Sequence, residues 1–323
     1  MKYSDRLGEI SKTQFQKALD QFNLGDFIDA TPIDRGLFGQ NVFIKSTKGE
    51  FVLRGCPHYN WQFPAEVYFS KLLHQNNIPV AAPYMYSKSK DIFGWEFILM
   101  PRLYGKSISP TMTDKDLSKS DEIGIAKALG SVLKEMQKVT MDHCGFYDLD
   151  SDDIKPLSMS YSERIYLNIQ NRLLQATEAN ALLTTKDDMK WIESILEQKQ
   201  EAMEMSFVPT YVMQDFKLEN MVVDKVSGEW KVTGIFDLME SYIGNIESDL
   251  SRTYCMYLDA GKRELGDVFV NAFLDDRIIE GFNERFPIFI LHDRLIIWSW
   301  RIKNNNLDEG MKKGFRWWIE RYL

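Results

Sequence analysis

The chain has 323 residues, 44% of them hydrophobic and 27% charged, and a formal net charge of −8. This length suggests about two domains, and the negative charge argues against nucleic acid as a partner. No run of about 18 uncharged apolar residues occurs, so no membrane span is expected, and the polar N-terminus does not resemble a signal peptide. Cys56, Cys144 and Cys255 lie far apart, which favours reduced thiols in a cytoplasmic protein.

The first hundred residues are expected to form a mostly antiparallel sheet with two helices. Phe15, Leu19 and Phe22 have the spacing of one apolar helix face, and Pro64 suits the first turn of a second helix. Two short apolar runs flank the polar stretch at residues 47–50, as in a hairpin. In chain order, the pattern predicts a helix over 11–24, strands over 42–44 and 51–53, a helix over 64–73, and strands over 80–86 and 93–100.

After Gly105 the pattern becomes helical, with one β-rich interruption over residues 208–237. The apolar periodicity predicts helices over 123–136, 165–174, 189–203, 250–258, 268–274, 288–302 and 311–322. The sequence therefore predicts an α+β fold of two lobes, a small antiparallel-sheet lobe over 1–102 and a larger helical lobe over 103–323. The hinge is expected near Pro101-Arg102-Leu103.

Two carboxylates and an amide follow the strand-like runs of the β-rich interruption. The segment from Asp215 to Asn220 reads DFKLEN and follows one apolar run, and Asp237 closes another. These residues suit phosphoryl transfer, which needs an aligned hydroxyl, metal ions on the phosphates and positive charge at the transferred group. Asp215 is the candidate that orients the acceptor hydroxyl, and Lys217 the candidate that neutralises developing charge. Asn220 and Asp237 offer the hard oxygen ligands that Mg²⁺ prefers.

These motifs resemble those of a known family. The DFKLEN segment is similar to the catalytic loop of the protein-kinase-like fold, and Ile235-Phe236-Asp237 resembles its metal-binding aspartate motif. The resemblance is closer to the aminoglycoside phosphotransferase family, and it extends over about residues 33–258. It implies a two-lobed kinase-like fold, ATP or GTP as co-substrate, and a bracing role for Asp249 in the segment GNIESDL.

The same resemblance assigns nucleotide-binding residues in the first lobe. Arg54, in the run FVLR, stands where the family has its phosphate-contacting cation, and Glu66 matches the acidic residue that pairs with that cation. The remaining nucleotide-binding candidates are Gly36 and Gly39, in a glycine-containing turn between strands, and Met100 and Leu103, at the expected hinge.

The chain departs from the family pattern at three places, one of which is Lys217, a residue more typical of protein kinases than of antibiotic kinases, which often have His there. Met213-Gln214 stands before Asp215 in place of the family's usual His-Gly. Asn245-Ile246 stands in place of the Asp-Pro of the later Gly-Asp-Pro segment. Asp215, Asn220 and Asp237, the minimum set for the chemistry, are all present.

Loop length indicates a small acceptor. Asp237 and Asp249 are only 12 positions apart, which leaves no room for the long activation segment on which a protein kinase positions its peptide. Net charge is +3 over residues 1–110 and −10 over residues 111–240, which suits an anionic co-substrate and a cationic acceptor. Candidate contacts to such an acceptor are Glu240, Glu247, Asp259, Asp275, Asp276, Asp293 and Asp308.

The expected activity is therefore O-phosphorylation of a small molecule, most simply an aminoglycoside-type antibiotic, which would connect the chain to antibiotic resistance. A metabolic kinase for a sugar, amino alcohol or macrolide is a second hypothesis. A catalytically silent nucleotide-binding protein of the same fold is a third, and the presence of Asp215, Lys217, Asn220 and Asp237 argues against it.

Overall fold

The structure, a computed structural model, describes residues 2–4, 8–33, 40–55, 57–109 and 117–323. They divide into two compact units. We call the first the sheet unit (Met1–Ile108, Tyr147–Lys155 and Glu219–Ser241) and the second the helical unit (Ser109–Phe146, Pro156–Leu218 and Tyr242–Leu323).

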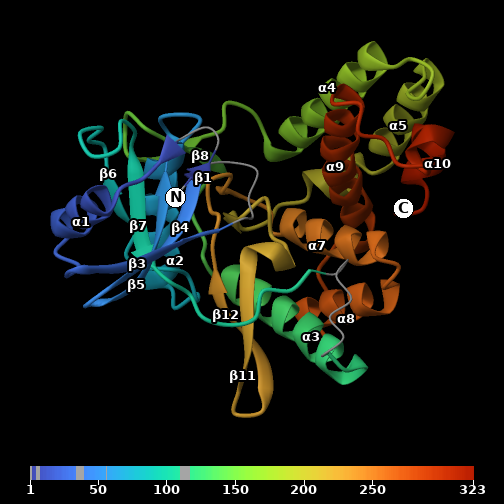
Figure 1. The fold of residues 1–323 in the computed structure, drawn as a ribbon. Helices are drawn as coiled ribbons and strands as arrows, with labels where there is room; N and C mark the ends of the chain where they lie inside the picture. Colours follow the sequence, from blue (N-terminus) through green and yellow to red (C-terminus); the bar gives the residue numbers. More distant parts are fainter. Residues whose placement is uncertain (1, 5–7, 34–39, 56, 110–116) are drawn as a thin grey trace. The chain divides into compact units, whose positions relative to one another are not determined.

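Figure 1 shows the elements along the chain. In the described residues the α-helices are α1 (Lys12–Gln21), α2 (Gln62–Gln75), α3 (Lys119–Met136), α4 (Tyr161–Ala179), α5 (Lys186–Gln198), α6 (Gln200–Glu204), α7 (Glu247–Asp259), α8 (Arg263–Leu274), α9 (Phe282–Lys303) and α10 (Phe315–Ile319). The strands are β1 (Lys2–Ser4), β2 (Gly8–Glu9), β3 (Phe27–Pro32), β4 (Gln40–Ser46), β5 (Gly49–Gly55), β6 (Met85–Ser87), β7 (Phe97–Pro101), β8 (Gly145–Asp148), β9 (Asp153–Pro156), β10 (Thr210–Val212), β11 (Met221–Val226), β12 (Glu229–Ile235) and β13 (Tyr242–Gly244). Two short 3₁₀ helices are η1 (Leu218–Asn220) and η2 (Met311–Lys313).

The sheet unit is built on a five-stranded antiparallel sheet in the order β3-β4-β5-β7-β6. Successive side chains of a strand point to opposite faces, and β5 uses both. Phe51 and Leu53 pack in one apolar cluster with residues of α1, and Val52 packs in another with Phe63 of α2. Arg54 continues the alternation, so its side chain lies on the α2 face of the sheet.

The hairpin of β11 and β12 belongs to the sheet unit although it lies far along the chain. Its base is fixed by a parallel bridge between Val80 and Ile235 and an antiparallel bridge between Lys106 and Val223. The sheet unit is therefore not continuous in sequence, because residues 219–241, which include Asn220 and Asp237, belong to it.

Helix starts in the described chain follow from local sequence. Ser11, Ser118, Ser160 and Thr185 each precede a helix and each form a capping box with the residue three positions later. Such a box satisfies two backbone donors that the first helical turn leaves open. The capped helices are α1, α3, α4 and α5.

The core of the helical unit joins α4, α5 and α9 to the C-terminal residues. Its fully buried members include Ile169, Ile192, Leu295 and Trp298. In a second layer α3 packs against α8, and α7 packs against both α8 and α9. In the described chain no helix combines the length and the apolar composition required to cross a membrane.

Several predicted elements differ in extent from those in the structure, and three are shortened or divided for clear physical reasons. The strand expected over 80–86 is reduced to Met85–Ser87, because Pro83 cannot donate a backbone hydrogen bond to a strand ladder. The helix expected over 189–203 divides at Lys199 into α5 and α6. The helix expected over 311–322 divides at Gly314, whose φ of 103° is incompatible with a continuous helix.

Candidate active site

The loop that carries Asp215 follows the buried strand β10 in the helical unit. Met213 and Phe216 are both fully buried and anchor the loop on either side of the aspartate. Gln214 adopts a positive φ of 71°, a conformation that is uncommon for a residue with a side chain. Because its neighbours are buried and Gln214 turns the backbone, Asp215 is partly exposed at the tip of the loop.

One face of α7 holds the backbone of three residues of this loop, Met213, Gln214 and Phe216. Asp249 accepts hydrogen bonds from the backbone N–H groups of Met213 at 2.6 Å and Gln214 at 2.8 Å. Thr253, four positions later on the helix, donates to the carbonyl oxygen of Phe216 at 2.5 Å. Positions separated by three and four residues share a helix face, so the contacts made by α7 are a direct result of helical spacing.

Asp249 is fully buried, as a bracing residue would be. Burial raises its pKa to about 7, although the two hydrogen bonds from the loop amides act in the opposite direction. Its oxygens are both occupied by loop backbone, and this geometry agrees with a structural role.

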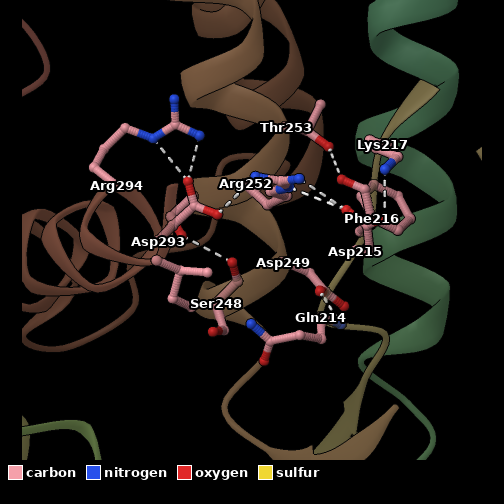
Figure 2. A network of polar contacts seen from close by, with 12 residues as sticks. Gln214, Asp215, Phe216, Lys217, Ser248, Asp249, Arg252, Thr253, Asp293 and Arg294 are labelled. Carbon is pink, nitrogen blue, oxygen red and sulfur yellow. Dashed lines mark hydrogen bonds and ion pairs between the residues drawn. The ribbon is translucent and has the colours of Figure 1, made fainter. Parts of the chain in front are cut away.

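The carboxylate of Asp215 lies between two cations, as Figure 2 shows. Lys217 Nζ is 2.5 Å from Oδ2, and the Arg252 guanidinium contacts Oδ1 through Nη2 at 2.9 Å and Nε at 3.2 Å. Burial alone would raise the pKa of Asp215, but Arg252 and Lys217 outweigh it and hold that pKa below its ordinary value. Asp215 is therefore an ionised carboxylate at neutral pH.

The sheet unit holds a second polar cluster around Arg54. Its Nη1 lies 2.7 Å from Oε1 of Glu66 on α2, and its Nη2 lies 2.7 Å from Oδ1 of Asp237. Burial alone would lower the pKa of the guanidinium, but the two carboxylates raise it, so Arg54 stays charged. Burial also raises the pKa of Glu66 to about 7, against the opposing effect of Arg54. The structure thus pairs Arg54 with Glu66, as the resemblance implied, and adds Asp237 as a second partner that was not predicted.

Asn220 and Asp237 meet at the base of the β11–β12 hairpin. Met221 pairs with Ile235, and the N–H of Phe236 donates to the carbonyl oxygen of Asn220 at 3.0 Å. Within the described chain no cluster of three or more His, Cys, Asp or Glu side chains has the geometry of a metal site. One carboxylate and one amide oxygen fit Mg²⁺, since this ion takes most of its ligands from phosphates and water.

The other nucleotide-binding candidates are only partly accounted for. Met100 is buried in the apolar cluster on the α2 face of the sheet, and Leu103 packs against that cluster and over Gly234. Gly36 and Gly39 lie outside the described residues. A role of these four residues in nucleotide binding stays a prediction.

The candidate acceptor contacts mostly have partners within the chain. Glu240, Asp259, Asp275, Asp276 and Asp308 are exposed. Five of the candidates are ion-paired with a basic residue: Glu247 with Arg285, Asp259 with Arg294 and Arg321, Asp275 with Lys134, Asp293 with Arg252 and Arg294, and Asp308 with Arg301. Contact of any of them with an acceptor stays a prediction, and for the paired ones it requires sharing the carboxylate with that internal cation.

Sequence reasoning missed Arg252 and Thr253. Both lie on α7, three and four positions after Asp249, so the helical spacing that follows the bracing aspartate was an available signal. The partners of Arg252 are not local: Asp215 is 37 positions before it and Asp293 is 41 positions after it. No pattern in the sequence identifies such partners.

Comparison with known proteins identifies the family. A model described as the phosphotransferase enzyme family matches residues 29–285. A comparison with curated protein sequences finds no relative.

Solved structures show the same fold at low identity. A candidate aminoglycoside phosphotransferase from Ralstonia eutropha has a TM-score of 0.67 and 14% identity, over 97% of this chain and 96% of that one. A candidate fructosamine-3-kinase from Haemophilus somnus has a TM-score of 0.62 and 13% identity, over 96% of both chains. A thermostable mutant of aminoglycoside phosphotransferase APH(4)-Ia, with ADP and hygromycin B, has a TM-score of 0.65 and 13% identity, over 95% of this chain and 96% of that one.

The predicted kinase-like α+β fold, with an antiparallel sheet followed by a mainly helical part, is confirmed by these structures. The match of the family model extends over the strand with Arg54, the loop with Asp215, and the motif with Asp237. The chain belongs to the phosphotransferase enzyme family.

Proposed function

We propose that the chain transfers the γ-phosphoryl group of ATP or GTP to a hydroxyl of a small molecule, with Asp215 as the residue that orients that hydroxyl. The observation that carries this proposal is the state of Asp215. It is ionised, partly exposed, and fixed by Lys217 and Arg252 at the tip of a loop that α7 braces. A carboxylate in this state can accept the acceptor's hydroxyl proton without first losing its own.

The remaining roles follow from charge. Lys217 offsets negative charge that develops on the transferred group, and Arg54 contacts the nucleotide phosphates, with Glu66 holding its guanidinium in place. Asn220 and Asp237 would hold Mg²⁺, which supplies charge compensation for the phosphates when bound. Asp249 keeps the loop backbone in position and takes no part in proton transfer.

The acceptor we propose first is an aminoglycoside-type antibiotic. The net charge of −10 over residues 111–240 would attract a polycation. One similar structure contains hygromycin B with ADP, and another, of an aminoglycoside 2′-phosphotransferase, contains GDP. Both ATP and GTP therefore belong in the test, and a cytoplasmic location would supply either nucleotide.

A metabolic acceptor is the second candidate. One similar structure is described as a fructosamine-3-kinase, and the chain's own arginines already pair with several of the carboxylates expected to bind a polycation. A sugar or amino sugar with at most one cationic group would need fewer free carboxylates than an aminoglycoside needs.

The test is a turnover screen with purified protein, Mg²⁺ and either ATP or GTP. Aminoglycosides, macrolides, sugars, glycated amines and amino alcohols are the acceptors, and nucleoside diphosphate release and product mass are the measurements. We expect one class to gain the mass of a phosphoryl group, with Asp215→Asn as the inactive control. Binding of Mg-nucleotide with no acceptor phosphorylated would favour the silent homologue instead.

A further inference from the structure

We infer that Arg252 is a positioning residue for Asp215: its guanidinium, anchored by Asp293, fixes the orientation of the catalytic carboxylate. This inference rests on the proposed function of Asp215. It adds a residue that lies outside the loop and metal motifs, and it explains how the loop is held in a chain with Met213-Gln214 before the aspartate.

The contacts fix the carboxylate at both ends. Arg252 Nη2 and Nε contact Oδ1 of Asp215 at 2.9 and 3.2 Å, and Lys217 Nζ contacts Oδ2 at 2.5 Å. Two cations on different oxygens oppose rotation of the carboxylate about its bond to Cβ.

Arg252 is itself anchored by Asp293, which in turn pairs with Arg294, as Figure 2 shows. Its Nη1 lies 3.4 Å from Oδ1 of Asp293, and Oδ2 of Asp293 is held by Arg294 through Nη2 at 2.5 Å and Nε at 2.8 Å. The side chains of Arg252, Asp293 and Arg294 are 17%, 9% and 2% exposed. Contacts this sheltered are screened little by water and salt, and a planar guanidinium suits such a two-sided bridge.

The two residues before Asp215 do not fix the orientation of its carboxylate. The Met213 side chain is buried and has no strong hydrogen-bonding group, and Asp249 reaches only the backbone of Met213 and Gln214. The backbone is therefore set by Asp249 and Thr253, whereas the direction of the Asp215 side chain is set by Arg252 and Lys217. Misplacing a catalytic group by about 1 Å can cost on the order of 10²-fold in rate.

The charges around Asp215 make the inference testable by pH. Lys217 comes from the loop, Arg252 and Asp249 from α7, and Asp293 lies behind Arg252 on α9. Removing Arg252 leaves one cation against the nearby carboxylates Asp249 and Asp293. The pKa of Asp215 must then rise, and the acidic limb of the kcat–pH profile must move to higher pH.

The kinetic experiment compares Arg252→Met, Arg252→Lys and a matched control, Lys262→Met. Lys262 forms a similarly sheltered ion pair with Glu122 in the helical unit, at 2.5 Å, without contacting the loop. We expect Arg252→Met to lower kcat by about 10- to 100-fold with the nucleotide KM unchanged. Arg252→Lys keeps the charge but loses the planar two-point contact, so its kcat is expected to lie between those of wild type and Arg252→Met. Lys262→Met should keep the wild-type kcat and pH profile.

A substrate-free measurement separates this inference from the proposed function. In ¹³C-carboxyl NMR of aspartate-labelled protein, the Asp215 signal is assigned from its loss in Asp215→Asn. We expect it to titrate at higher pH in Arg252→Met than in wild type, and the shift to be smaller in Arg252→Lys, which keeps the charge but loses the planar two-point contact. If wild type phosphorylates no acceptor, the proposed function fails, but the titration still decides whether Arg252 controls Asp215.

Two results would overturn the inference. One is an Asp215 titration that stays the same in folded Arg252→Met and Arg252→Lys. The other is a loss of kcat in Arg252→Met that is matched by Lys262→Met, because it would reflect general destabilisation. If Arg252→Met does not fold, Arg252→Lys provides the same comparison of kcat and of the Asp215 titration.

Discussion

The guanidinium of Arg54 donates a hydrogen bond of 2.7 Å to the carboxylate of Asp237, 183 positions later in the chain. The contact links the strand that carries the phosphate-binding candidate with the hairpin that carries the metal candidate. Glu66 contacts the same guanidinium from α2 and has no exposed surface. One buried cation therefore contacts two carboxylates of the candidate site, and its removal is expected to affect stability.

Arg54→Met is expected to lower the free energy of unfolding by about 3–5 kcal/mol, because it leaves the buried Glu66 carboxylate without its cation. Urea denaturation measures the loss. The double variant Arg54→Met/Glu66→Gln should recover a large part of it, since the remaining group is neutral. If the double variant were no more stable than Arg54→Met, the stability effect would not come from the buried charge.

Thr253→Val tests the bracing of the loop backbone. Thr253 is 1% exposed, and the change removes its bond to the Phe216 carbonyl oxygen with little change in volume. We expect a stability loss of about 1–2 kcal/mol and a several-fold lower kcat, with nucleotide affinity unchanged. Thr253→Ser, which keeps the hydroxyl, serves as the control and should retain most of the activity.

Gly130 allows the close packing of α3 against α8. A Cβ at this position would lie 2.4 Å from the carbonyl oxygen of Phe269. Gly130→Ala should therefore destabilise the protein by about 1–3 kcal/mol through overpacking, partly offset by a gain of roughly 1 kcal/mol in helix propensity. Thermal unfolding shows whether the variant is less or more stable than wild type. A higher melting temperature would show that the two helices can separate without cost.

His292 gives the folded protein a defined pH dependence. It is buried on α9, and burial lowers its pKa from the ordinary value of 6.5 to about 4. Because the unfolded chain binds a proton there at higher pH than the folded chain, stability falls as the pH drops from about 6.5 towards 4. The loss attributable to His292 is about 2–3 kcal/mol.

The measurement for His292 is urea denaturation at pH 7.5 and pH 4.5. We expect the difference between the two pH values to be smaller in His292→Gln than in wild type. The exposed His74 provides the control, since His74→Gln should keep the wild-type difference. Equal pH dependence in all three proteins would show that His292 does not resist protonation in the folded state.

Much of the fold could be predicted because its elements have strong local signals. Ser11 and Ser118 cap helices where the apolar periodicity begins, and the hairpin of β4 and β5 follows from two apolar runs and a polar turn. Breaks inside apolar runs were harder to predict. At Lys199 and Gly314 the helical sequence pattern continues although the helix ends.

The candidate site was predictable where function depends on short motifs. Asp215, Lys217, Asn220 and Asp237 stand in two segments whose residue types alone suggest their roles. Arg252 could not be assigned in this way, because an arginine on an amphipathic helix is ordinary until its distance to Asp215 is known. The pairing of Asp293 with Arg252 and Arg294 depends likewise on how α7 and α9 pack.

The most direct test of the whole account compares Asp215→Asn with Asp237→Asn. Turnover and Mg-nucleotide affinity are measured for each in the presence of the best acceptor. Asp215→Asn is predicted to lower kcat by a factor on the order of 10²–10⁴ while Mg-nucleotide affinity stays close to wild type. Asp237→Asn is predicted to remove the Mg²⁺-dependent part of that affinity. Equal loss of nucleotide affinity in both variants, or full turnover in Asp215→Asn, would contradict the assigned roles.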